Sequence, residues 1–115
     1  MEARATQKYV RVSPQKARLV VDLIRGKNAG EALSILNYTK KRVTQAVEKV
    51  LRSAIANAED KAEHLDVDQL VVSKAYVNEG PRSKRIRPAP MGRAYRYQRR
   101  TSHVTVVVES PEERD

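Results

Sequence analysis

The chain of 115 residues contains no cysteine. Disulfide bonds and zinc sites built from thiolates are therefore excluded, and a reducing cytosol is the compartment that this composition favours. No uninterrupted apolar run exceeds three residues, so no stretch is long enough to span a membrane. Residues 1–4 lack the apolar stretch of a secretory signal. We therefore expect a soluble cytosolic protein that has no membrane partner.

Groups suited to catalysis are also scarce. His64, Asp66 and Asp68 have the composition of a metal cluster but no further ligand at a suitable spacing, so an exposed turn is the interpretation we favour. Ser102 and His103 are adjacent, but neighbours on a strand point to opposite faces and cannot form a nucleophile–base pair. The sequence has no glycine-rich phosphate loop. We predict that the chain is not an enzyme and holds no metal or cofactor.

Positive charge is concentrated in one segment. Lys and Arg number 23 against 14 Asp and Glu, which gives a formal net charge of +9, and eight of these net units lie in residues 81–100. The basic residues of this segment, which has no acidic residue, are Arg82, Lys84, Arg85, Arg87, Arg93, Arg96, Arg99 and Arg100. A segment with so few apolar groups cannot order itself by burial. A localised basic feature on a nearly neutral body indicates a nucleic-acid contact.

Strand-like runs flank this basic segment, over residues 67–78 and 103–109. Folding them together, with residue 72 opposite about 107 and 77 opposite about 102, predicts a β-hairpin prolonged into a basic arm that turns near residues 89–91. At about 3.3 Å per residue, ten residues each way would reach about 30 Å beyond the body. Tyr95 and Tyr97 either stack on unpaired bases or cover the backbone of the ribbon. Because an isolated ribbon is marginal in water, we expect a polyanion to order the arm.

The remaining sequence predicts helices and one more strand. A short strand is expected over residues 4–12, and Ser13 followed by Pro14 indicates a helix start. This helix runs to about Arg25, where Gly26 ends it. Its apolar stripe is formed by Ala17, Val20, Val21 and Ile24 and widened by Leu19 and Leu23. Residues 29–38 and 41–62 predict two further helices, the last with apolar residues at regular helical spacing. In the hairpin strands, the expected inward residues are Leu70, Val72, Tyr76, Val104, Val106 and Val108.

Two basic groups lie outside the arm. Lys16, Arg18 and Arg25 fall on the polar faces of the first helix, as a solvated surface or as a second RNA contact. Residues 40–42 are all basic and stand where the third helix begins, against its dipole. Charges placed in this way often mark function, so we hypothesise that the helix start binds a phosphate. Solvated lysines on a frayed turn are the alternative.

Four sequence blocks stand out: YVRVSPQKARLVVDLIRGK (9–27), VLRSAIANAE (50–59), AYVNEGPRSKRIRP (75–88) and GRAYRYQRRTSHVTVVVE (92–109). In this order and spacing they resemble the family of large-subunit ribosomal protein number twenty-two. The resemblance implies an α+β fold, with a small three-stranded antiparallel sheet packed on three helices and a long extended β-hairpin arm. We expect a single domain with a body (1–78 and 102–110), a basic arm (79–101) and a polar tail (111–115) that is disordered.

The resemblance also implies a function. The chain would be a structural component of the large subunit in the cytoplasmic ribosome. It would bind large-subunit ribosomal RNA, bridge several RNA domains during assembly and line the nascent-peptide exit tunnel with its arm. Its partners would be this RNA, neighbouring large-subunit proteins and the nascent peptide, and we expect a monomer when it is free.

The RNA contacts follow from the arm and from this resemblance. Besides the basic residues of the arm and Tyr95, they are Arg11, Ser13, Lys16, Arg18, Arg25, Thr101, Ser102 and His103. The tip that faces the tunnel would consist of Pro88, Ala89, Pro90, Met91, Gly92 and Arg93. Ala89 and Met91 stand where the family commonly carries basic residues, so this tip is less charged.

Two rival functions fit the same charge pattern. An architectural DNA-binding protein could use such a ribbon arm in the minor groove, although those arms work in pairs from an intertwined dimer. A protein-interaction module could instead bind acidic partners through the arm. Competition between duplex DNA, structured RNA and an acidic peptide would separate the three.

Overall fold

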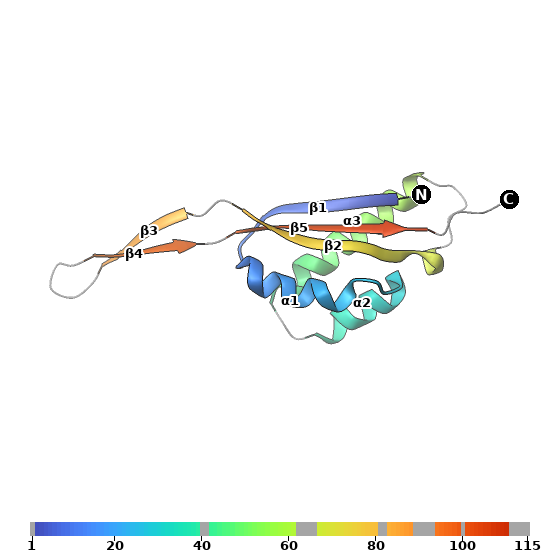
Figure 1. Ribbon diagram of the computed structural model, residues 1–115, viewed down its shortest axis with the longest axis horizontal. Helices are drawn as coiled ribbons and strands as arrows, with labels where there is room; N and C mark the ends of the chain where they lie inside the picture. The colour runs from blue at the N-terminus through green and yellow to red at the C-terminus, as the bar shows by residue number, and fades with distance from the viewer. Residues whose placement is uncertain are drawn as a thin grey trace.

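The computed structural model describes residues 2–39, 42–61, 67–80, 83–88, 94–99 and 101–110, with the backbone alone described for 83–88 and 94–99 (Figure 1). In chain order the elements are β1 (Glu2–Val10), α1 (Pro14–Ile24), α2 (Ala29–Tyr38), α3 (Thr44–Lys61), a short 3-10 helix η1 (Val67–Gln69), β2 (Val71–Glu79), β3 (Ser83–Pro88), β4 (Ala94–Arg99) and β5 (Ser102–Glu109). The predicted strand at 67–69 is wrong, because these residues form η1. The first strand also lies two residues earlier than predicted.

The central sheet has the order β1–β5–β2, and both pairings are antiparallel. β5 takes the middle because its β-branched run is buried on both faces, from Val104 to Val108. The three helices pack on one face of this sheet (Figure 1). The predicted α+β fold, with three antiparallel strands on three helices, is therefore confirmed.

The register between β2 and β5 differs from the prediction. Val72 lies opposite Val108, and Val77 lies opposite Val104, so the predicted register was wrong by one residue and then by two. The pairing shifts between Val72 and Lys74, where a β-bulge inserts one extra residue. Because side chains alternate with a period of two, the bulge reverses which residues face the core. Tyr76 was expected inside, but its side chain lies on the opposite face and is 37% exposed.

Helix α1 begins as predicted. The Lys16 N–H donates to the Ser13 hydroxyl at 3.4 Å, and Pro14 is the first helical residue. Gly26 has φ +80°, a left-handed conformation that suits glycine, just beyond the end of the helix. The predicted widening of the apolar stripe is wrong, because Leu19 and Leu23 are 54% and 44% exposed. Only the narrower stripe reaches the sheet and the other helices.

Helix α3 starts later than predicted, at Thr44 instead of residue 41. Residues 40 and 41, and residue 62 at the other end, lie outside the described residues. The buried stripe of α3 includes Val47, Val50, Leu51, Ala54 and Ala58. Its alanines allow the helix to approach β1 and β5 closely, and it also contacts α2.

Beyond the sheet, β3 and β4 form a separate two-stranded antiparallel ribbon (Figure 1). The pairing runs from Ser83 opposite Arg99 to Pro88 opposite Ala94. The predicted turn and tip residues 89–93 lie outside the described residues, as do Arg82, Arg100 and the predicted tail 111–115.

Candidate RNA-binding surface

The register of the ribbon pairs basic with aromatic positions. Arg85 lies opposite Tyr97, and Arg87 lies opposite Tyr95. On the neighbouring positions, Lys84 lies opposite Gln98 and Ile86 opposite Arg96. The register therefore places basic residues at successive positions along both strands. Such a run of cations could neutralise several phosphate groups.

The base of the arm is held by a close contact between its two sides. The Gly80 N–H donates to the Thr101 carbonyl oxygen at 2.9 Å. A Cβ at Gly80 would clash with Thr101 Oγ1 and would lie 3.2 Å from His103 Cε1, so only glycine allows this approach. Glycine at this point brings the start and the end of the arm together.

The predicted contacts Ser102 and His103 lie in different surroundings. Ser102 is fully buried and its hydroxyl donates to the Val12 carbonyl oxygen at 2.7 Å. His103 is partly exposed on the other face of the sheet. A direct RNA contact by Ser102 would require its bond to Val12 to open, whereas His103 is accessible.

Tyr9 is a surface residue that the sequence reasoning missed. Its N–H donates to His103 Nδ1 at 3.1 Å, and the two rings meet edge to face with centroids 5.1 Å apart. Tyr9 has φ 62°, an uncommon conformation for a tyrosine, where the β1–β5 register shifts between Gln7 and Val10. The irregular alternation of residues 4–12 was the available signal, but it does not show where the ring points.

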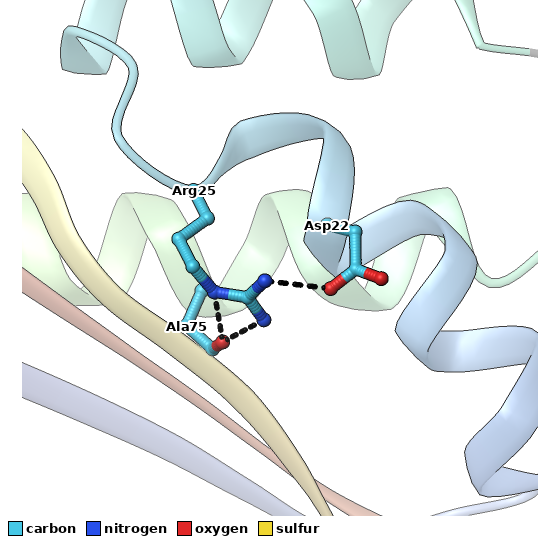
Figure 2. A network of polar contacts seen from close by, with 3 residues as sticks. All are labelled: Asp22, Arg25 and Ala75. Carbon is cyan, nitrogen blue, oxygen red and sulfur yellow. Dashed lines mark hydrogen bonds and ion pairs between the residues drawn. The ribbon is translucent and has the colours of Figure 1, made fainter.

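Arg18 and Arg25 cover the free edge of β2. Arg25 donates from Nε and Nη2 to the Ala75 carbonyl oxygen at 3.1 and 2.6 Å, and its Nη1 lies 2.8 Å from Asp22 Oδ1 (Figure 2). Arg18 donates from Nη2 to the Val77 carbonyl oxygen at 3.0 Å. Carbonyls on an edge strand otherwise form a template for pairing with another chain. These arginines therefore have a structural role that the sequence reasoning did not consider, while RNA binding by them remains a prediction.

The chain between α1 and α2 completes the cover on the same edge. The Gly26 N–H donates to the Val72 carbonyl oxygen, the Val72 N–H to the Lys27 carbonyl oxygen and the Ala29 N–H to the Leu70 carbonyl oxygen, at 2.8 to 2.9 Å. On the opposite edge, Asn57 and Lys61 of α3 donate to the carbonyl oxygens of Arg4 and Glu2 at 2.8 and 2.9 Å. Polar side chains of helices thus shield carbonyls on both edges of the sheet.

The start of α1 keeps two of its predicted contacts accessible. Arg11 and Lys16 are exposed, and Ser13 is partly buried as the helix cap. No acidic residue occupies the first turn of α1. Free N–H groups and nearby cations favour an anion at a helix N-terminus.

The start of α3 borders a polar pocket of about 400 Å³. Its lining residues are Leu36, Asn37, Thr39, Arg42, Thr44, Gln45 and Glu48. The Thr44 hydroxyl is buried and has no hydrogen-bond partner in the described part of the chain. The Glu48 carboxylate is engaged by Arg52 at 3.0 Å. The hypothesis of a phosphate at this helix start remains a prediction, and two of its three cations lie outside the described residues.

Metal and membrane sites were searched in the same described ranges. They contain no group of three or more His, Asp or Glu side chains placed to hold a metal ion. None of the helices described there is long and apolar enough to cross a membrane. His64 and Asp66, two members of the metal cluster considered above, lie outside these ranges.

Comparison with known families supplies the decisive observation. The family model described as ribosomal protein L22p/L17e matches residues 5–109. The chain belongs to this family. It is 64% identical over 112 residues to the large ribosomal subunit protein uL22 of Solibacter usitatus (strain Ellin6076), covering 97% of this chain and 99% of the relative. It is 58% identical over 113 residues to the uL22 protein of Oceanobacillus iheyensis, covering 98% and 99%.

Membership in the L22p/L17e family decides between the functions considered above. The relatives are named as ribosomal proteins, so the prediction of a ribosomal protein and not an enzyme is confirmed. The architectural DNA-binding protein is not favoured. The family match covers the body, the arm and its base together, since it extends from β1 to the end of β5.

Proposed function

We propose that this L22p/L17e protein is a structural component of the large ribosomal subunit in the cytoplasm, and that it binds large-subunit ribosomal RNA chiefly through the arm. The observation that carries this proposal is the family match over residues 5–109. The charge pattern agrees with it, because the arm segment 81–100 holds eight basic residues and no acidic one. A ribbon of this kind repels itself, and an RNA polyanion removes that repulsion.

The arm is suited to bridging RNA segments. Its ribbon carries basic positions along both strands and aromatic positions opposite two arginines. Arginine binds phosphate through its fork of donors and also stacks on base planes, so the ribbon can be enclosed by RNA on several sides. We infer that it bridges RNA domains during assembly and that its tip, residues 88–93, lines the nascent-peptide exit tunnel. The nascent peptide and neighbouring large-subunit proteins are its further partners, and the free protein is a monomer that forms a single domain.

The proposed RNA contacts on the body differ in their exposure and in the hydrogen bonds that they already form within the protein. Arg11, Lys16 and His103 are at least partly exposed and available. Arg18 and Arg25 already donate to β2, so they reach RNA only through their remaining N–H groups. Ser13 and Ser102 act mainly on the protein, as a helix cap and as a buried hydrogen bond.

Salt dependence tests the role of the arm. Each phosphate neutralised releases counterions, so about eight contacts give a log–log slope of affinity against salt of about −6 to −7. The triple variant Arg85→Gln, Arg87→Gln and Arg96→Gln should reduce this slope by about 2 to 3. Filter binding to large-subunit ribosomal RNA measures both slopes. A matched triple variant of exposed cations on the body, Lys27→Gln, Lys49→Gln and Arg52→Gln, should leave the slope nearly unchanged.

Co-sedimentation tests the assignment to the ribosome. In a lysate at high magnesium, the protein should travel with large subunits. Its absence from them would contradict the proposed function. A shallow salt slope, with co-sedimentation intact, would contradict only the arm as the main contact.

A further inference from the structure

The second face of the central sheet is not covered by any described helix. The core cluster contains Val104, Val106 and Val108 of β5 together with residues of the three helices. Side chains alternate along a strand, so His103, Thr105 and Val107 lie on the opposite face. We call this opposite side of β1, β5 and β2 the open face.

The register sets the residues of the open face in three rows. Arg4, Val107 and Lys74 form the first row, and Thr6, Thr105 and Tyr76 form the second. His103 and Asn78 form the third, next to the base of the arm. Thr6 and Thr105 are joined through their hydroxyls at 3.0 Å. The rows bring together residues that are about 30 to 100 positions apart in the sequence.

The charge of the open face is polarised. Val107 is only 1% exposed although it lies outside the core cluster, and the register flanks it with Arg4 and Lys74, which are both exposed at the surface of the sheet. Glu2 and Glu109, which lie opposite each other, are at the end of the face that is distant from the arm. Arg4 and Lys74 stand in the row next to this acidic pair, and the two rows nearer the arm carry no formal charge.

Aromatic rings lie beside these cations. Tyr76 is exposed on β2, diagonal to His103 on β5, and such diagonal neighbours lie about 7 to 8 Å apart. On the other side, the Tyr9 ring meets the His103 ring edge to face at 5.1 Å, and 61% of Tyr9 is exposed. His103 accepts the Tyr9 N–H through Nδ1, which leaves Nε2 as its donor. A left-handed backbone at a tyrosine is costly, and here it places a ring beside the base of the arm.

We propose that the open face binds unpaired nucleotides of ribosomal RNA, with bases stacked on Tyr9 and Tyr76. The phosphates are bound by Arg4, Lys74 and Lys8, an exposed residue two positions after Thr6 on β1. This inference rests on the proposed function and adds the surface and the kind of RNA structure that it takes. Exposed rings on a flat sheet suit bases that have left a helix, because paired bases present no free plane for stacking. Arg4, Lys8 and Lys74 outnumber Glu2 and Glu109 on this face, which favours a polyanion over a basic partner.

The open face is continuous with the arm. The Gly80 and Thr101 contact at the base of the arm lies against His103, which belongs to the third row. One RNA strand can therefore pass from the open face along the base of the arm to the basic ribbon. This continuity favours RNA over an acidic protein, because a single RNA strand can occupy the arm and the open face together.

A comparison of single-stranded and duplex RNA tests the inference. The probes are a 12-nucleotide oligoadenylate and its duplex with oligouridylate. The double variant combines Tyr9→Asn with Tyr76→Leu, and Tyr38→Leu is the matched control. Asparagine tolerates the left-handed backbone of position 9, and Tyr38 is 84% exposed on α2, away from the open face. In the double variant, each replaced tyrosine should lower the affinity for the single strand by about 5-fold or more, while the affinity for the duplex should change little. The control should bind both probes as the wild type does.

Two outcomes overturn the inference: unchanged single-strand affinity of the double variant, or an equal loss on the duplex. Tyrosine nitration of the wild-type protein gives a measurement that needs no variant. Oligoadenylate should protect Tyr9 and Tyr76 from nitration but not Tyr38, and equal nitration with and without the probe contradicts the proposal. Co-sedimentation of the wild type with large subunits is measured in parallel. Its failure overturns the proposed function, whereas normal co-sedimentation with unprotected tyrosines overturns only the open face.

Discussion

Arg25 offers the sharpest test of how the helices protect the sheet. Replacing Arg25 by Ala removes two N–H donors from the Ala75 carbonyl oxygen and the ion pair with Asp22 (Figure 2). Hydrogen bonds from a charged donor contribute about 1.5 to 3 kcal/mol. The side chain of Arg25 is 46% exposed, so water replaces part of the loss and the lower end of this range applies. The exposed ion pair with Asp22 adds about 0 to 1 kcal/mol.

We therefore expect Arg25→Ala to lower the free energy of unfolding by about 1.5 to 2 kcal/mol. For a chain of this length, that corresponds to a fall in Tm of about 5 to 10 °C. Urea and thermal unfolding followed by circular dichroism measure both quantities. Arg25→Lys should give an intermediate loss, because an ammonium group cannot donate through the same planar fork.

Arg52→Ala is the matched control for this experiment. Arg52 pairs with Glu48 at 3.0 Å, so its guanidinium is engaged along α3 itself. This pair should contribute about 0.3 to 0.5 kcal/mol. Equal stability of Arg25→Ala and Arg52→Ala would refute the reasoning that α1 arginines stabilise the edge of β2. The uncovered edge should also make Arg25→Ala more prone to self-association, which light scattering detects.

Two further substitutions test the base of the arm. Gly80→Ala should cost about 1 to 3 kcal/mol, because the new Cβ clashes with Thr101 Oγ1, and adding Thr101→Ala should recover part of this loss in thermal unfolding. If Gly80→Ala unfolds at the wild-type temperature, the close approach is not required. Ser102→Ala should lower stability by about 1 to 3 kcal/mol in urea, since the partly buried Val12 carbonyl oxygen loses its 2.7 Å hydrogen bond. RNA affinity of the folded Ser102→Ala protein should stay unchanged, and a large loss of affinity in the folded variant would instead show that Ser102 contacts RNA directly.

Local signals predicted much of the fold correctly. The Ser13 cap with Pro14 marked the start of α1, and the left-handed Gly26 follows its end. Apolar spacing identified all three helices, and α2 has the predicted bounds. These features depend on residues within one or two helical turns, so the sequence contains the whole signal.

Predictions that depend on partners far along the chain were less successful. The bulge between Val72 and Lys74 shifts the register with β5 and turns Tyr76 out of the core. No residue in this run marks a bulge by itself, because the shift arises from how two strands 30 residues apart fit together. Leu19 and Leu23 were expected to be buried, since a helical stripe does not show how wide the contact with its neighbours will be.

The sequence by itself determined where the positive charge lies, which segments become helices and strands, and that a basic ribbon extends from a body of ordinary composition. Only the tertiary structure decided which basic side chains form hydrogen bonds within the protein. Arg18 and Arg25 donate to strand carbonyls 50 to 59 residues away. It also decided that Tyr9, Tyr76 and His103 share one face of the sheet. The physical reason is the sequence separation of the interacting residues. Helix caps and apolar periodicity depend on residues close in the sequence, whereas the partner of a side chain is set by strand pairing across the whole fold.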